Sequence, residues 1–165
     1  RGRHRLYVAD SHLHQILLYT TDGEYQGRWG SRGSGQGELN FPTNLAVDQA
    51  GNLHVVDTGN FRVQVFDPDG KSLSTFGRAG DAPGNFHRPK GIAVDSEGHT
   101  YVTDAAFNNF QIFDGPGQLL LFVGQAGREP GAFWLPAGIH IDGNDRIFVV
   151  DQINRRVQVF AYLRG

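Results

Sequence analysis

The sequence predicts an all-β protein built from repeated four-stranded antiparallel units, and three observations support this fold class. The same residues return every 47 positions without insertion or deletion, which is the spacing of Asp10, Asp57, Asp104 and Asp151. Each unit holds four short apolar or alternating segments bounded by turn residues, as strands do. The 165 residues include 23 Gly, 12 Phe and 7 Pro, a composition that suits short strands joined by tight turns.

Several positions recur in every unit. The four aspartates above close the phrases RLYVAD, LHVVD, TYVTD and IFVVD, and three others close NLAVD, GIAVD and GIHID. An aromatic residue follows at a fixed distance, and a proline precedes each new unit: Tyr19, Phe66, Phe113 and Phe160; Pro42, Pro89 and Pro136. The repeat therefore organises the whole chain.

The second unit shows the expected elements most clearly. We expect strands over 44–48, 52–57, 62–67 and 71–77, called a, b, c and d. The a–b and c–d links have hairpin length and contain a Gly able to adopt positive φ. The b–c link is also short, and the d–a link is long and Gly-rich. Four antiparallel strands per repeat predict a β-propeller blade rather than a helical solenoid.

These units resemble the NHL repeat. Residues 89–95, PKGIAVD, match the opening of the family pattern, and NFRVQVFD at 60–67 and NRRVQVF at 154–160 match its third segment. The resemblance covers essentially the whole chain. The first unit departs most, with Leu13 at the Asn position and Thr20 at the final Asp position. Within this pattern, the resemblance implies that Arg62 and Arg156 are structural partners between blades.

The register predicts an incomplete ring. The chain starts just before a b strand and ends after a c strand, which gives three a, four b, four c and three d strands. We divide it into a partial blade (1–42), two whole blades (43–89 and 90–136) and a partial blade (137–165). The resemblance implies closure with six blades, so about three and a half are present.

An open array leaves apolar flanks and an unpaired strand edge exposed to water. Three alternatives follow: the chain is a fragment of a longer one, it associates with itself, or another chain completes the ring. The absence of Met, and hence of an initiator residue, favours a fragment.

The repeated aspartates Asp10, Asp57, Asp104 and Asp151 allow two interpretations. A ring of carboxylates at one face would hold a cation. Alternatively, a carboxylate at a strand end accepts backbone N–H bonds from the next turn. Recurrence in every blade favours the structural role, because binding sites are normally asymmetric.

The b–c and d–a loops should emerge on one face, where the residues differ between blades as a binding site would require. A mixture of Arg and aromatic residues is typical of protein hot spots and of single-stranded RNA platforms. The candidate binding residues are His12, His14, Arg32, Phe61, Arg78, Arg88, Phe107, Asn108, Arg128, Trp134 and Arg155.

We predict neither catalytic residues nor a cofactor. The chain has no Cys and no GxSxG motif, and its seven His have no zinc-ligand spacing, so no metal ligands are assigned. The Gly-rich links open no helix and are not phosphate loops. His140 replaces Ala46 and Ala93 on an innermost strand, which makes it a candidate for lining the central channel.

The favoured function is a non-catalytic scaffold that binds a protein partner through the loop face. One alternative is a metal-dependent enzyme, since relatives of the fold include lactonases and the peptidyl-amidating lyase. The other is RNA binding, as in some NHL domains, but 15 basic against 17 acidic residues disfavour nucleic acid. No segment predicts membrane insertion. The resemblance to bacterial NHL-repeat proteins, often exported, favours a periplasmic or extracellular location.

Overall fold

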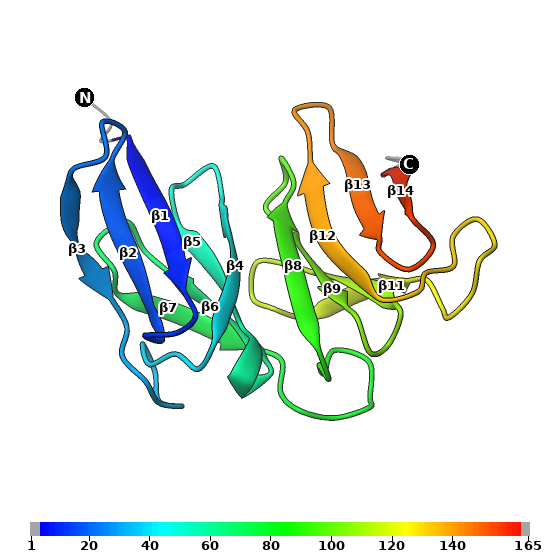
Figure 1. Cartoon of the computed structure of the whole chain (residues 1–165), viewed down its shortest axis with the longest axis horizontal. Helices are drawn as coiled ribbons and strands as arrows, with labels where there is room; N and C mark the ends of the chain where they lie inside the picture. Colours follow the sequence, from blue (N-terminus) through cyan, green and yellow to red (C-terminus); the bar gives the residue numbers. More distant parts are fainter. Residues whose placement is uncertain (1–3, 163–165) are drawn as a thin grey trace.

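The computed structural model describes residues 4–162, which form four antiparallel sheets (Figure 1). The first blade contains β1 (Arg5–Asp10), β2 (Gln15–Thr20) and β3 (Tyr25–Trp29). The second contains β4 (Pro42–Val47), β5 (Leu53–Asp57), β6 (Arg62–Phe66) and β7 (Ser72–Phe76). The third contains β8 (Pro89–Val94), β9 (Thr100–Asp104), β10 (Asn109–Phe113) and β11 (Leu119–Val123). The fourth contains β12 (Pro136–Ile141), β13 (Arg146–Asp151) and β14 (Arg156–Ala161).

This arrangement confirms the all-β prediction and the order of strands in the blades. In each sheet, strands that are neighbours in sequence are hydrogen-bonded neighbours. The part of the chain that the structure describes holds three a, four b, four c and three d strands, and the sheets do not close into a ring. A single 3₁₀ turn, Thr58–Asn60, forms the second b–c link. The predicted end segments also include residues 1–3 and 163–165, which lie outside the described residues.

The hydrophobic core lies between successive sheets. The inner strands β4, β8 and β12 lie side by side, and apolar clusters fill the three spaces between neighbouring blades. Adjacent residues of a strand face opposite sides, so Val55 packs toward the first blade and Val56 toward the third. Strand β5 is therefore buried along its whole length, whereas β14, with one covered face, alternates between half-buried and exposed residues.

The inner strands begin earlier than the sequence indicated. Pro42 already pairs with Asp57, and a bulge separates it from Asn44, where we expected the strand to start. Proline has no N–H to donate, so it is found at the first residue of a strand or at a bulge. The same irregularity follows Pro89 and Pro136. It accounts for the recurring proline before each unit.

The outer flanks of the array expose apolar residues. Leu6 and Val8 are exposed on the first blade, and Val150, Val157 and Val159 on the fourth. The corresponding positions in the second and third blades are buried against a neighbouring sheet. These flanks are thus faces that a neighbouring blade covers elsewhere in the same chain.

The core between the second and third blades provides a test of this packing. The ring of Phe113 is 1% exposed and its centroid lies 4.8 Å from that of Phe76. We expect Phe113→Ala to lower the free energy of unfolding by about 3–5 kcal/mol in urea denaturation. Leu120→Ala, at a side chain that is 51% exposed, should change it by less than about 0.5 kcal/mol. Equal losses in the two variants would contradict the packing described.

Candidate functional site

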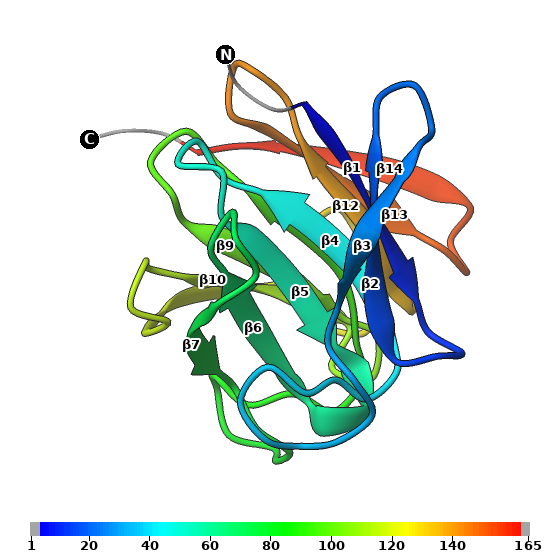
Figure 2. The same ribbon diagram turned by 90° about the vertical axis from the view of Figure 1, so that its left-hand side faces the viewer.

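The b–c loops (11–14, 58–61, 105–108 and 152–155) and the d–a loops (30–41, 77–88 and 124–135) lie together at one end of the blades, here called the loop face (Figures 1 and 2). Backbone hydrogen bonds join them at each blade junction. The N–H groups of Gly59, Ala105 and Ile153 donate to carbonyl oxygens at 2.7, 3.0 and 3.1 Å. The acceptors are the carbonyls of Asn40, Arg88 and Trp134.

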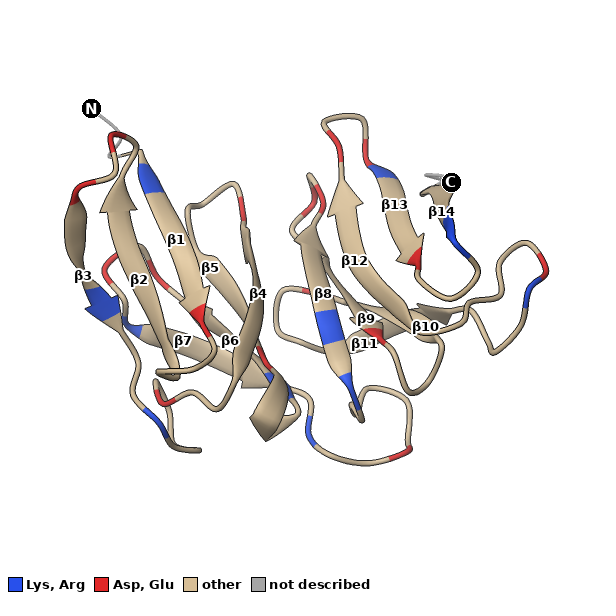
Figure 3. Cartoon of the chain, viewed as in Figure 1, with Lys and Arg blue, Asp and Glu red and all other residues tan. Residues whose placement is uncertain are grey.

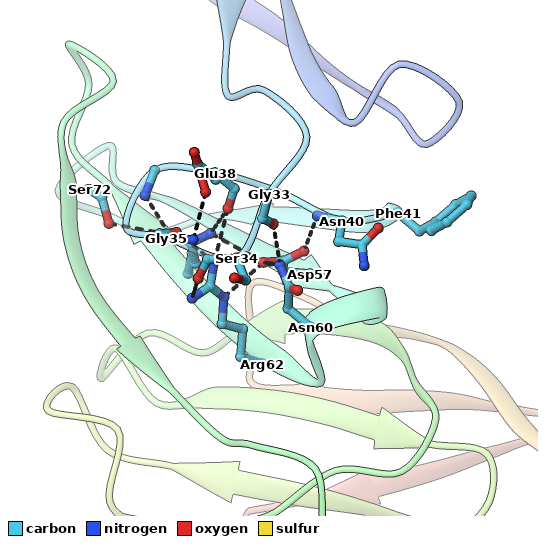
Figure 4. A network of polar contacts seen from close by, with 12 residues as sticks. Gly33, Ser34, Gly35, Glu38, Asn40, Phe41, Asp57, Asn60, Arg62 and Ser72 are labelled. Carbon is cyan, nitrogen blue, oxygen red and sulfur yellow. Dashed lines mark hydrogen bonds and ion pairs between the residues drawn. The ribbon is translucent and has the colours of Figure 1, made fainter.

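A buried carboxylate organises this junction in the second blade (Figure 4). Asp57 is fully buried and accepts hydrogen bonds from the Asn40 N–H at 2.6 Å and the Asn60 side chain at 2.8 Å. The Arg62 Nε donates at 2.8 Å and the Gln64 amide at 3.2 Å. The carboxylate therefore connects the loop before the blade with its b and c strands.

The Arg62 guanidinium extends the network into the preceding d–a loop. Its terminal nitrogens donate to the carbonyl oxygens of Ser34, Gly35 and Glu38 at 2.9, 2.8 and 3.0 Å. Arg156 repeats the pattern in the fourth blade, donating to the carbonyls of Glu129 and Ala132. The aromatic ring of Phe41 points away from this network (Figure 4).

The other repeated aspartates are also hydrogen-bonded. Asp151 accepts from the Trp134 N–H, Asn154, Arg156 and Gln158. Within the described residues, Asp104 accepts hydrogen bonds only from backbone N–H groups, those of His87, Arg88, Ala106 and Phe107. Asp10 accepts from Leu13 and Gln15. Residues 4–162 contain no group of three or more His, Asp or Glu arranged to hold a metal ion.

Two opposing effects act on the Asp151 carboxyl. Burial disfavours its charged form, but the hydrogen bonds from the Trp134 N–H, Asn154 and Arg156 outweigh burial. The pKa of Asp151 therefore lies below its ordinary value. The ionised carboxylate is the form that this junction requires.

Each b–c loop ends with a residue in the left-handed region. His14, Phe61, Asn108 and Arg155 have φ between 54° and 56°. This conformation is uncommon for residues other than Gly. The same backbone turn thus presents four different side chains, so the scaffold repeats while the chemistry at its surface varies.

The predicted binding residues form separate contacts at the blade junctions. The His14 ring is 7% exposed, packs edge-on against Phe41 at 4.6 Å and accepts the Phe41 N–H through Nδ1. The ring centroids of Phe107 and His87 lie 6.1 Å apart. The Arg128 guanidinium carbon lies 5.6 Å from the centroid of the Trp134 ring. Asn108 accepts the Leu135 N–H.

The remaining predicted residues differ in exposure. Phe61 is half-buried and packs against the core between the second and third blades. The side chains of His12, Arg32, Arg78, Arg88 and Arg155 are exposed. His140 is exposed too, and its ring lies 6.2 Å from that of Phe148, its cross-strand partner. Because Ile139 packs toward the third blade, His140 faces the open flank of the fourth.

Two exposed apolar residues of the loop face were absent from the candidate set. Leu13 and Ile153 lie in the first and fourth b–c loops and are both about half exposed. Leu13 occupies the position of Asn60, and Ile153 that of Gly59. An apolar residue where the second unit places Asn or Gly was the available signal. Together with Phe41 and Trp134, they make the loop face partly apolar.

Charge differs between the two ends of the blades (Figure 3). The loop face carries five arginines, Arg32, Arg78, Arg88, Arg128 and Arg155, against Glu38, Asp81 and Glu129. The a–b and c–d turns (48–52, 95–99 and 142–145; 20–24, 67–71 and 114–118) carry ten acidic residues and one basic residue, Lys71. The near-neutral total therefore hides an acidic end and a mildly basic end.

The NHL repeat pattern matches residues 39–66 and 86–113. The WD40 β-propeller domain of Doa1 has a TM-score of 0.71 at 13% identity, covering 98% of this chain and 48% of that chain. For an auxiliary nutrient binding protein from Bacteroides thetaiotaomicron, the TM-score is 0.70 at 17% identity, with 95% and 45% covered. For virginiamycin B lyase from Staphylococcus aureus, the TM-score is 0.66 at 12% identity, and the match covers 98% of this chain and 53% of the lyase chain.

The fold and its repeated junctions define an all-β protein with propeller blades, and the solved structures share that fold. Within this class, the chain carries NHL repeats. It spans about half the length of the solved structures it matches. No curated protein sequence gives a significant match.

The Asp151 junction yields a prediction about acid stability. Because its folded-state pKa is lowered, Asp151 contributes stability that is complete above about pH 4 and is lost as the pH falls through the folded-state pKa. We expect Asp151→Asn to lower the free energy of unfolding at pH 7 by about 1–3 kcal/mol. Below about pH 4, the free energy of unfolding of this variant should also depend less steeply on pH than that of the wild type. Urea denaturation from pH 7 to pH 3 measures both effects.

The matched control is Asp69→Asn in an exposed c–d turn. The free energy of unfolding of this variant should equal that of the wild type at every pH, because the Asp69 side chain accepts no hydrogen bond among the described residues. A loss in Asp69→Asn as large as in Asp151→Asn would contradict the assigned role of the junction.

Proposed function

We propose that the chain is a non-catalytic scaffold that binds a protein partner through its loop face. The observation that carries this proposal is the Arg128–Trp134 pair. Trp134 is 44% exposed although its backbone is fixed by hydrogen bonds to Asp151 and Ile153. Trp and Arg are enriched among the residues that dominate protein–protein binding. A rigidly held aromatic residue loses little conformational entropy on binding.

The surroundings of this pair support the same proposal. Phe41, 51% exposed, lies at the junction of the first and second blades, whereas Trp134 lies at that of the third and fourth, and Leu13 and Ile153 add further apolar surface. Five arginines are spread among these apolar residues and give the loop face an excess of positive charge. Aromatic residues and Arg are enriched in protein–protein interfaces. We infer that the partner presents a largely acidic or neutral surface here, because the loop face carries five arginines against three acidic residues.

The resemblance to exported bacterial NHL-repeat proteins supports a periplasmic or extracellular setting for this interaction. No helix among residues 4–162 is long and apolar enough to cross a membrane. The apolar outer flanks support completion of the ring by further blades, from the same chain, a second copy or another protein. Similarity to the lyase, at 12% identity, concerns the fold.

Site-specific crosslinking tests the proposal. A photo-crosslinking amino acid at Phe41 and one at Trp134 should each capture the same protein in cells, while one at Asn144 in an acidic a–b turn should not. With the captured protein purified, Trp134→Ala should weaken binding at least tenfold, which is the effect expected of a hot-spot residue. Tyr25→Ala, which removes an exposed aromatic residue away from the loop face, should leave affinity unchanged. Equal effects of the two substitutions would refute the proposal.

A further inference from the structure

The third blade departs from its neighbours at the arginine position of the junction. Asn109 occupies the place of Arg62 and Arg156 and pairs across the sheet with Asp104, as Arg62 pairs with Asp57. Its side chain is too short to reach the preceding d–a loop as the two arginines do. The Oδ1 of Asn109 is buried and has no hydrogen-bond partner among the described residues. An unsatisfied buried acceptor is energetically unfavourable and therefore needs an explanation.

A pocket of about 290 Å³ lies beside Asn109. Asp81 and Ala82 line it, and they are the counterparts of Ser34 and Gly35, whose carbonyl oxygens accept hydrogen bonds from the Arg62 guanidinium. The pocket thus lies beside the loop segment that contacts the guanidinium in the second blade. Removing the arginine side chain leaves that space open.

The loop around the pocket keeps the arrangement seen in the arginine-containing junctions. Gln111 accepts the Gly84 N–H at 2.8 Å and donates to the Asn85 carbonyl at 2.9 Å. Gln64 makes the same two contacts in the second blade, to Gly37 and Glu38. The d–a loop is therefore held in position without the arginine, and a ligand would find the site already formed.

The third blade also lacks the ion pair that arginine makes in the second and fourth blades. Asp57 and Asp151 each have an arginine Nε at 2.8 Å. Asp104 is equally buried, but no ion pair to it is found within residues 4–162. A carboxylate removed from water without a cation nearby attracts a positive group.

Two aromatic residues distinguish the walls of the pocket from the equivalent regions of the second blade. Phe107 replaces Asn60, and Phe122 replaces Thr75; both line the pocket. Arginine is the cation best suited to such a site, because its planar guanidinium stacks on aromatic rings and presents a fork of donors to oxygen atoms. Its aliphatic stem also packs on apolar walls.

We propose that this pocket, here called the arginine socket, binds the guanidinium group of an arginine side chain on a protein partner. The incoming group replaces in trans the arginine that Arg62 and Arg156 supply within their own blades. The inference deepens the proposed function, on which it rests, by naming a chemical feature of the partner. It also concerns a pocket distinct from the Arg128–Trp134 pair.

The socket can be tested without knowing the partner by titrating N-acetyl-argininamide into the ¹⁵N-labelled protein. We expect saturable NMR shifts of the Asn109 side-chain amide and of the Ala82 backbone amide. N-acetyl-lysinamide should bind at least tenfold more weakly, because an ammonium lacks the planar fork of donors. Equal binding of the two probes, or no saturable shift with the arginine probe, would overturn the proposal.

Two variants give opposite expected results. Asn109→Arg restores the side chain found in the neighbouring blades, so it should fill the socket, abolish the probe-induced shifts and raise the melting temperature. Arg62→Asn should open a space in the second blade without the aromatic walls, with new but weaker shifts at Gly35. Because Asn109→Arg follows the pattern of two other blades, we expect it to fold. Undiminished probe binding by folded Asn109→Arg would overturn the proposal.

Trp134→Ala separates this inference from the proposed function. It should leave probe binding in the socket unchanged, since Trp134 does not line the pocket. Probe binding combined with unchanged partner affinity in Trp134→Ala would refute the loop-face function and leave the socket standing. Loss of partner affinity in Trp134→Ala without any probe binding would refute the socket alone.

Discussion

The structure depends on the hydrogen bonds between buried carboxylates at the ends of the b strands β5, β9 and β13 and the loops that arrive from the preceding blades. The N–H groups of Asn40, His87 and Trp134 donate to Asp57, Asp104 and Asp151 at 2.6, 2.8 and 2.8 Å. Burying a carboxylate is strongly unfavourable unless its oxygens are hydrogen-bonded. Each arriving d–a loop must therefore place its N–H group at the carboxylate. This requirement helps to fix the position of each sheet relative to the preceding one.

Fixing the backbone in this way allows the surface residues to vary. The left-handed residue that ends each b–c loop is His, Phe, Asn or Arg, although φ changes by only 2° among them. Non-glycine residues adopt this conformation at a cost in free energy, which the surrounding hydrogen bonds must offset. A junction strong enough to hold any of the four side chains gives the protein a rigid surface on which chemistry can differ from blade to blade, as preorganised binding requires.

Much of this fold could be predicted from the sequence because the repeat carries it. The 47-residue spacing predicted antiparallel sheets of propeller type, and the turn residues separated the strands. The sequence alone could not predict which neighbouring residues surround each position in the folded protein. Aligning Asn109 with Arg62 showed a substitution, but the pocket beside it depends on the loop at 81–85 keeping its course. Similarly, His14 belongs to an exposed type of loop, yet its ring is buried because Phe41 folds over it.

The third blade shows how a repeat acquires a site without losing its scaffold. Asp104 satisfies its oxygens with four backbone N–H groups, where Asp57 uses one backbone group and three side chains. Because backbone N–H groups alone satisfy the carboxylate, an arginine is no longer needed at position 109 to hydrogen-bond it. It can then be occupied by a shorter residue, and Gln111 still holds the loop. The charge of Asp104 stays behind, so the vacated position retains an attraction for a cation that the chain itself no longer supplies.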